Sequence, residues 1–205
     1  MAKSEKTQFI LAHGAGAPCT SDWMNLLTEI ITDRSKASIL VHRFNFDYME
    51  KRVIDGRNYP PDRMPKLLSK WTSVIKEFRN EKQVFIGGKS MGGRAASLLN
   101  FNELPQVSGL INFGFPFHAP GKPPGERIIH LENLQIPCLI NQGERDPMGT
   151  KEEIRQYKLS KRIEINYLVD GNHDLKPRVK SGVTLEENLT NSVDRMIKFI
   201  GRIRK

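Results

Sequence analysis

Three residues, far apart along the chain, have the chemical types needed to activate a hydroxyl nucleophile: Ser90, Asp146 and His173. A serine hydroxyl is a weak nucleophile until a neighbouring base removes its proton. His173 could accept that proton and return it to a leaving group, while Asp146 could fix the tautomer of the imidazole and stabilise the imidazolium ion. The three residue types together predict acyl transfer through a covalent serine intermediate.

The residues around Ser90 form the pattern G-x-S-x-G, from Gly88 to Gly92. This pattern is typical of a nucleophile elbow, a sharp turn from a strand into a helix that holds the serine in a strained backbone conformation. Glycines are needed there because strand and helix pass too close for side chains. The apolar residues 84–86 predict the strand, and the alanines and leucines after Gly93 predict the helix.

Two phosphate-binding motifs that share residues with these loops are incomplete. A P-loop ending at Lys89 and Ser90 needs a glycine at position 83, where the chain has Gln83. A dinucleotide-binding fingerprint that starts at Gly14 needs glycine or alanine at position 19, where the chain has Cys19. We therefore expect no nucleotide cofactor, and no other cofactor is indicated.

The elements that must position these residues alternate between buried strands and amphipathic helices. Ser90 follows the third expected strand, Asp146 the fifth and His173 the sixth. This alternation predicts an α/β fold, a three-layer α/β/α sandwich with about six mostly parallel strands. Ligands bind at the carboxyl ends of such strands, so the three side chains should meet there. No repeat or linker is visible, so residues 1–205 should form a single domain. The expected strands cover residues 8–12, 38–44, 84–86, 107–113, 137–141 and 162–168.

Negative charge that develops on a substrate oxygen would need backbone N–H donors. We expect these donors from Met91, directly after the serine, and from Ala15, in the glycine-rich loop after the first strand. His13 begins that loop and could shape it or contact the substrate. His118 lies in a loop rich in proline and glycine, residues 114–125, and could also contact the substrate.

The acid of the predicted site has alternatives. Asp170 and Asp174 are nearer to His173 along the chain, but a neighbour on the same loop seldom reaches the far ring nitrogen. Asp146 could instead be a turn residue, and Ser90 could be only a small residue in a tight turn. The expectation for Asp146 rests on its place after a strand.

Composition restricts the class of protein. The chain has 205 residues, 38% of them hydrophobic and 27% charged, which fits a globular protein with a real core. The net charge of the chain is +9, and more than half of this positive excess lies from Lys176 onward. Basic residues there suit the solvated C-terminal end of a helix, so we expect no nucleic-acid partner. The alternative is that this segment binds an anionic partner. Cys19 and Cys138 form neither a disulfide framework nor a metal site. Without an apolar span or an apolar signal segment in residues 1–6, we expect a cytoplasmic protein.

Five segments that span nearly the whole chain form a recognisable set: LAHGAGA (11–17), IGGKSMGGR (86–94), FPFHAPGKP (115–123), QGERDP (142–147) and DGNHDLKPR (170–178). Together they resemble a family of small α/β-hydrolases related to dienelactone hydrolases. Relatives of this family include the hydrolase-like domain of a chromatin-associated acetyltransferase-complex subunit. The resemblance implies the α/β-hydrolase fold and a triad of Ser90, Asp146 and His173, in the chain order Ser, Asp, His; it implies no substrate.

We therefore expect a serine hydrolase that cleaves a small carboxylic ester or thioester. The chain is too short for a large lid domain, so we expect a shallow pocket walled by residues 43–63 and 114–125. Lys89 should either pack in the site or contact a substrate carboxylate. The alternative is a non-catalytic scaffold or binding module that keeps the fold. The sequence indicates no oligomeric state for either alternative.

Overall fold

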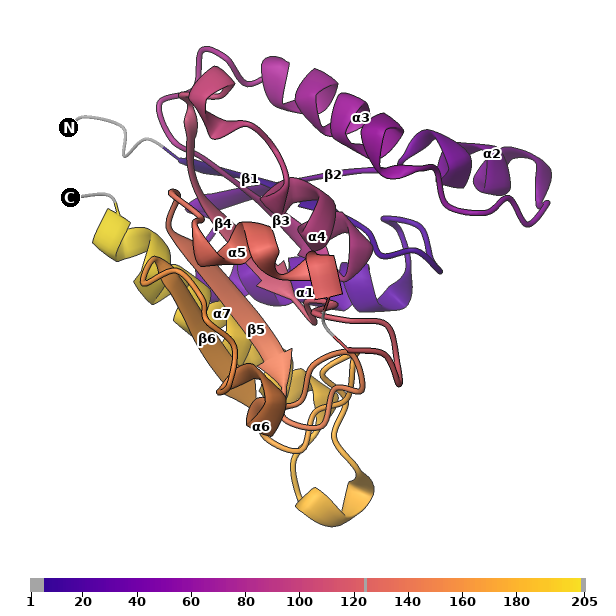
Figure 1. Cartoon of the computed structure of the whole chain (residues 1–205). Helices are drawn as coiled ribbons and strands as arrows, with labels where there is room; N and C mark the ends of the chain where they lie inside the picture. Colours follow the sequence, from indigo (N-terminus) through magenta and orange to yellow (C-terminus); the bar gives the residue numbers. More distant parts are fainter. Residues whose placement is uncertain (1–5, 124, 204–205) are drawn as a thin grey trace.

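A six-stranded sheet forms the centre of the computed structural model, which describes residues 6–123 and 125–203 (Figure 1). The strand order is β2-β1-β3-β4-β5-β6, and every neighbouring pair is parallel. The expectation of a parallel sheet is therefore confirmed. The strands are β1 (Thr7–Ala12), β2 (Ile39–Phe44), β3 (Val84–Lys89), β4 (Val107–Phe113), β5 (Cys138–Gly143) and β6 (Ile163–Leu168).

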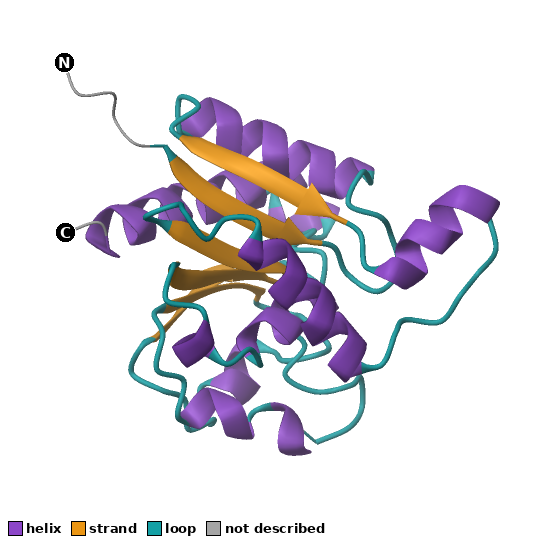
Figure 2. Ribbon diagram, turned by 90° about the horizontal axis from the view of Figure 1, so that it is seen from above, coloured by secondary structure: helices purple, strands orange, loops and turns teal. Residues whose placement is uncertain are grey.

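Helices cover both faces of this sheet (Figure 2). The helices α1 and α7 pack on one face, while α3 and α4 pack on the other. This is the expected three-layer sandwich, with no large additional domain. The helices are α1 (Asp22–Arg34), α2 (Asp47–Asp55), α3 (Met64–Lys76), α4 (Met91–Ser97), α5 (Ile129–Glu132), α6 (Lys151–Ile154) and α7 (Leu185–Ile203), with short 3₁₀ turns at Phe101–Glu103, Gly125–Arg127 and Val179–Ser181.

Central strands are buried on both faces, which explains their continuous apolar sequences. In β1, Phe9 and Leu11 enter the core under α1 and α7. Ile10 and Ala12 enter the core under α3 and α4. Neighbouring side chains of a strand point to opposite faces, so each such strand contributes to two hydrophobic cores. This burial fixes the register of the sheet and hence the height at which each strand ends.

Residues 43–63, which are expected to wall the pocket, include a helix. They contain α2, which buries Tyr48 and Met49 and ends at Gly56 in the left-handed region with φ 72°. The sequence signal was weak because only one short apolar pair marks the buried face. Asp47 contributes an acidic side chain to the first turn and pairs with two lysines of α3.

Capping boxes start the helices α6 and α7. Thr184 and Glu187 make the reciprocal hydrogen bonds of the capping box before α7. The helix α6 is short, spanning Lys151–Ile154, and its capping box is formed by Thr150 and Glu153. Within the described ranges, none of the helices has the length and apolar character of a membrane span. Residues 1–5, on which the expected absence of a signal segment rests, lie outside the described residues. The same holds for Arg204 and Lys205, which contribute to the positive charge of the C-terminal segment.

Candidate active site

Ser90 occupies the turn between β3 and α4 in a strained backbone conformation, with φ 49° and ψ −116°. A residue other than glycine in such a region costs on the order of 1–3 kcal/mol. The flanking glycines are required by contact: a Cβ atom would lie 2.6 Å from the Ala12 oxygen at Gly88 and 2.5 Å from the His13 oxygen at Gly92. The turn is the predicted elbow, and it projects Ser90 from the carboxyl end of β3.

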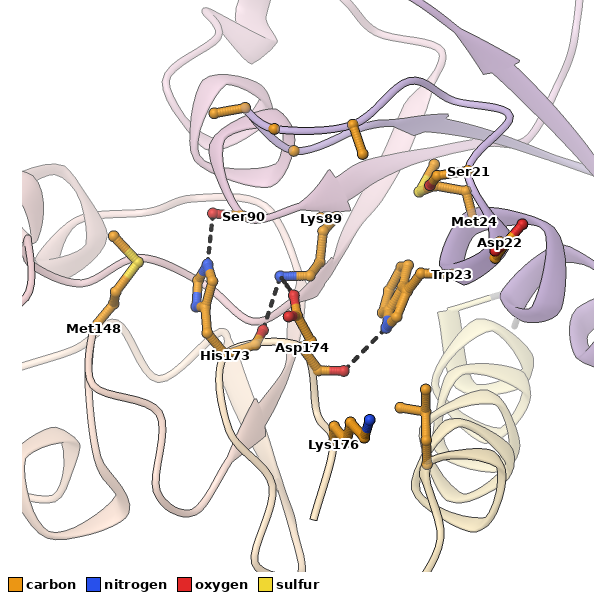
Figure 3. A pocket seen from close by; sticks show the side chains of 15 residues that line it. Ser21, Asp22, Trp23, Met24, Lys89, Ser90, Met148, His173, Asp174 and Lys176 are labelled. Atoms are coloured by element: carbon orange, nitrogen blue, oxygen red, sulfur yellow. Dashed lines mark hydrogen bonds and ion pairs between the residues drawn. The ribbon is translucent and has the colours of Figure 1, made fainter. Parts of the chain in front are cut away.

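The structure brings Ser90, His173 and Asp146 together. Nε2 of His173 lies 2.8 Å from Oγ of Ser90, and Nδ1 lies 2.8 Å from Oδ2 of Asp146 (Figure 3 shows the Ser90 contact). With the proton of the neutral ring on Nδ1, directed at the carboxylate, Nε2 is free to accept the Ser90 proton. The arrangement can therefore carry a proton from the hydroxyl to the imidazole.

Asp146 is fully buried, and its carboxylate is held by further donors. The amide of Gln142 donates to Oδ2 at 2.8 Å, and the backbone N–H of Met148 donates to Oδ1 at 2.8 Å. Gln142 itself is bound on its oxygen by the N–H of Phe115 at 2.7 Å. The sequence analysis does not assign a role to Gln142; the available signal is a long polar side chain at the end of a buried strand.

The two alternative acids are engaged elsewhere. Asp170 pairs with Arg145 at 2.8 Å and with both guanidinium and backbone of Arg178, which hold the pKa of its carboxyl well below its usual range. Asp170 also has a positive φ of 50°, so these contacts fix a strained start of the loop that carries His173. Asp174 faces Lys89 rather than the imidazole, at 3.1 Å from its ammonium.

Lys89 joins the elbow to the histidine loop (Figure 3). Its ammonium donates to the backbone carbonyl of His173 at 2.8 Å and lies 5.7 Å from the centre of the Trp23 ring. Trp23 in turn donates to the carbonyl of Asp174 at 3.0 Å. Burial lowers the pKa of Lys89, and the Asp174 carboxylate partly offsets that effect. Of the two roles expected for Lys89, packing within the site is the one observed.

His13 lies behind the loop that follows β1, not in the cavity. Its buried ring accepts the N–H of Phe46 on Nε2 at 3.1 Å, so the proton is on Nδ1, which donates to the carbonyl of Gly14 at 2.5 Å. Burial lowers the pKa of His13 to about 4, which keeps the ring neutral. Both ring nitrogens of His13 are therefore engaged in shaping the loop, and the residue is not among those that line the cavity at Ser90.

His118 also differs from its expected position. Its side chain is 4% exposed, with Nδ1 donating to the carbonyl of Ala119 at 2.9 Å and Nε2 lying 3.5 Å from the Glu153 carboxylate. Glu153 belongs to the capping box of α6, together with Thr150. His118 therefore packs the proline-rich loop against α6, and it is not among the side chains that line the cavity at Ser90.

A cavity of about 680 Å³ opens beside Ser90 and His173. Its walls come from the loop after β1, the start of α1 and the histidine loop, and none of its lining residues belongs to 43–63 or 114–125, contrary to expectation. Apolar side chains form much of the surface, and four charged residues, Asp22, Lys89, Asp174 and Lys176, also line the cavity. Two backbone N–H groups are expected to donate to the oxyanion. Met91 directly follows Ser90 in the sequence, and Ala15 lines this cavity. The lining residues are Gly14, Ala15, Gly16, Ala17, Ser21, Asp22, Trp23, Met24, Lys89, Ser90, Met148, His173, Asp174, Lys176 and Leu185.

Metal chemistry has no candidate site in the part of the chain that the structure describes, where no three His, Cys, Asp or Glu side chains cluster suitably. Cys19 and Cys138 are both buried free thiols, and burial raises the pKa of each. Neither is a lining residue of the cavity at Ser90.

Comparison with known proteins adds the family. A family model described as an alpha/beta hydrolase domain matches residues 5–201. Est1E from Butyrivibrio proteoclasticus, solved with ferulic acid bound, has a TM-score of 0.67 at 14% identity, covering 98% of this chain and 92% of its own. Dienelactone hydrolase from Anabaena variabilis has a TM-score of 0.67 at 16% identity, with coverages of 96% and 86%. XC6422 from Xanthomonas campestris, a serine hydrolase without a lid, has a TM-score of 0.62 at 18% identity, with coverages of 93% and 82%. At these identities the likeness shows the fold.

Proposed function

Because the chain belongs to the alpha/beta hydrolase domain family, we propose that it is a serine hydrolase that cleaves a small carboxylic ester or thioester. The observation that carries the proposal is the continuous relay from Ser90 through His173 to Asp146, with two contacts of 2.8 Å. Such a relay supplies a nucleophile, a base and an orienting acid. Esterase and dienelactone hydrolase among the related folds support the same class of reaction.

The proposed reaction has two halves. Oγ of Ser90 attacks the carbonyl carbon while Nε2 of His173 takes the hydroxyl proton of Ser90. The oxyanion of the tetrahedral intermediate accepts hydrogen bonds from the backbone N–H groups of Met91 and Ala15. His173 then returns the proton to the leaving oxygen or sulfur, which departs and leaves an acyl-serine. Water attacks this ester with His173 again as base, and the carboxylic acid leaves as Ser90 regains its proton.

The cavity suggests the size of the substrate. Its volume of about 680 Å³ and the side chains of Trp23, Met24 and Leu185 suit an apolar acyl or alcohol group of modest size. The related fold described as lacking a lid supports direct access from solvent. We therefore propose soluble esters or thioesters with short aliphatic or aromatic groups as substrates.

A scaffold that merely kept the fold would gain nothing from a serine at φ 49°, since a glycine at position 90 would relieve the strain. It would also not need a fully buried carboxylate behind an imidazole. Both features favour the enzyme over the non-catalytic alternative.

The test is hydrolysis of p-nitrophenyl acetate by the full chain and by Ser90→Ala. We expect wild-type turnover, a loss of at least about 10³-fold in the variant, and a nearly unchanged thermal midpoint. Ser35→Ala, a serine at the far end of α1, is the matched control and should keep wild-type rates. Equal turnover by Ser90→Ala and wild type would overturn the proposal.

A further inference from the structure

Two successive carbonyl groups of the loop after β1 converge on one phenol. The hydroxyl of Tyr48, on α2, lies 3.4 Å from the oxygen of Gly14 and 3.1 Å from the oxygen of Ala15. The Gly14 oxygen also accepts the proton of His13 Nδ1 at 2.5 Å, and Nη1 of Arg52 lies 3.5 Å from the Ala15 oxygen. The back of the loop is therefore held by three side chains.

These contacts decide where the N–H groups of the loop point. In a trans peptide the carbonyl and the following N–H are directed to opposite sides, and the described residues contain no cis peptide bond. A Gly14 carbonyl turned toward Tyr48 directs the N–H of Ala15 away from α2. The Ala15 carbonyl does the same for the N–H of Gly16. Ala15 and Gly16 both line the cavity that holds Ser90.

The phenol is itself rigidly held. Tyr48 is 2% exposed, and the guanidinium of Arg52 stacks 5.2 Å from the centre of its ring. Arg52 is anchored in turn by donating to the carbonyl of Tyr59 through Nε at 2.7 Å and through Nη2. Burial raises the pKa of Tyr48 to about 12, so the hydroxyl keeps its proton throughout the neutral range. Residues 43–63 thus form a support behind the loop rather than a wall of the cavity.

We propose that Tyr48 is a positioning residue for the oxyanion hole, whose hydroxyl aims the backbone N–H of Ala15 at the substrate oxygen, with Arg52 as its brace. This inference rests on the proposed function, since an oxyanion hole matters only if acyl transfer occurs. A peptide released from Tyr48 would be free to rotate, and the donor would spend less time aligned with the developing charge. The loss would appear in the transition state and not in the binding of the substrate.

The test compares Tyr48→Phe with wild type in the full chain. We expect kcat for p-nitrophenyl acetate to fall about 10-fold, less than the 10²–10³-fold typical of a lost donor, while KM stays unchanged. The inhibition constant of a trifluoromethyl ketone, which forms a tetrahedral oxyanion on the serine, should rise by the same factor. Tyr157→Phe, whose ring packs on Phe117 beyond α6, makes the same chemical change and should alter neither quantity.

A second variant covers the case in which Tyr48→Phe does not fold. Arg52→Met removes the brace and should lower kcat and weaken the ketone in parallel, by a smaller factor. Unchanged kcat and inhibition constant in a folded Tyr48→Phe, or a rise in KM alone, would overturn the inference while leaving the hydrolase proposal intact. If Tyr48→Phe is unfolded, unchanged values in Arg52→Met would overturn it. Absence of turnover in wild type would instead overturn the proposed function and the inference with it.

Discussion

Lys89 donates a hydrogen bond of 2.8 Å to the backbone carbonyl of His173, which lies 84 residues further along the chain. The residue directly before Ser90 is therefore bound to the residue that faces Ser90. The same ammonium pairs with Asp174 at 3.1 Å, so one buried cation holds two consecutive residues of the histidine loop. The distance between hydroxyl and imidazole thus depends on a link outside the relay itself.

Replacement of Lys89 by methionine tests this link. Methionine keeps most of the length of the side chain but cannot donate, so we expect the histidine loop to shift and kcat to fall by about 10²-fold, the cost typical of a displacement near 1 Å. Asp174→Asn, which removes only the ion pair, should cost much less. Steady-state kinetics on an ester decide the matter, and equal rates for Lys89→Met and wild type would refute a positioning role.

Asp146→Asn should be severely impaired although it remains folded. The asparagine amide offers an N–H to Nδ1 of His173, which favours the wrong imidazole tautomer, and we expect kcat to fall by about 10⁴-fold. The exposed Asp33 provides a control for the same substitution and should keep full activity. Activity of Asp146→Asn within tenfold of wild type would mean that another acid serves His173.

The ion pairs of Asp170 predict acid-sensitive stability of the histidine loop. Arg178 and Arg145 depress the pKa of this carboxyl in the folded state, whereas the unfolded value is about 3.9. The stabilisation is therefore present above the unfolded pKa and is lost as the pH falls through the folded pKa. The thermal midpoint of wild type should exceed that of Asp170→Asn at pH 6, and the difference should shrink toward pH 2.5. A difference independent of pH would contradict this assignment.

The buried His13 and the partly buried His130 predict a loss of stability as the pH falls below neutrality. Burial lowers the pKa of His13 and of His130 to about 4, below the unfolded value of about 6.5. Between these values the unfolded chain binds protons that the folded chain does not, so stability falls as the pH decreases from 6.5 to 4. For His13 the loss is up to about 3 kcal/mol.

Urea unfolding of wild type and His130→Gln at pH 7 and pH 4.5 measures this effect. The variant should lose less free energy of unfolding between the two pH values than wild type does, because it lacks one of the two groups. Identical losses in the two proteins would exclude His130 as a contributor.

Close packing behind the histidine loop predicts that Gly143→Ala reduces activity. A Cβ at Gly143 would lie 2.3 Å from the Asn172 oxygen and 2.4 Å from the Gly171 oxygen, so the loop must move. Gly201, in α7, has open space around it, and alanine there should stabilise the helix by about 0.5–1 kcal/mol without changing kcat. Kinetics and thermal midpoints of both variants test the prediction, which fails if Gly143→Ala retains wild-type kcat.

Sequence patterns were sufficient for the sheet and for the convergence of Ser90, Asp146 and His173. Buried parallel strands carry long apolar runs, and their carboxyl ends meet at one edge, so residues placed after different strands are brought together by topology alone. The G-x-S-x-G spacing additionally fixed the turn at Ser90, because the close contacts at Gly88 and Gly92 exclude side chains.

The supporting contacts could not be predicted in the same way. Lys89, Gln142 and Tyr48 act through partners that are remote in sequence, and polar residues of these types have no periodicity that reveals such partners. The glycine- and proline-rich loops around His13 and His118 suggest substrate contact. The burial of both side chains depends on α2 and α6, elements whose sequence signals are weak or short.

Ion pairs within the fold account for part of the positive charge of the C-terminal helix. Arg195 and Arg202 both pair with Glu164 of β6. The cytoplasmic location, the single domain over residues 1–205, the absence of a nucleic-acid partner and the likeness to a chromatin-associated subunit stay predictions.

Covalent labelling tests whether Ser90 is an activated nucleophile. The folded full chain is treated with a fluorophosphonate probe, and the modified residue is located by mass spectrometry of peptides. We expect one stoichiometric adduct on Ser90, formed much more slowly in His173→Gln and absent in Ser90→Ala. Folded wild-type protein that remains unlabelled at Ser90, or that is labelled equally fast in His173→Gln, would contradict it.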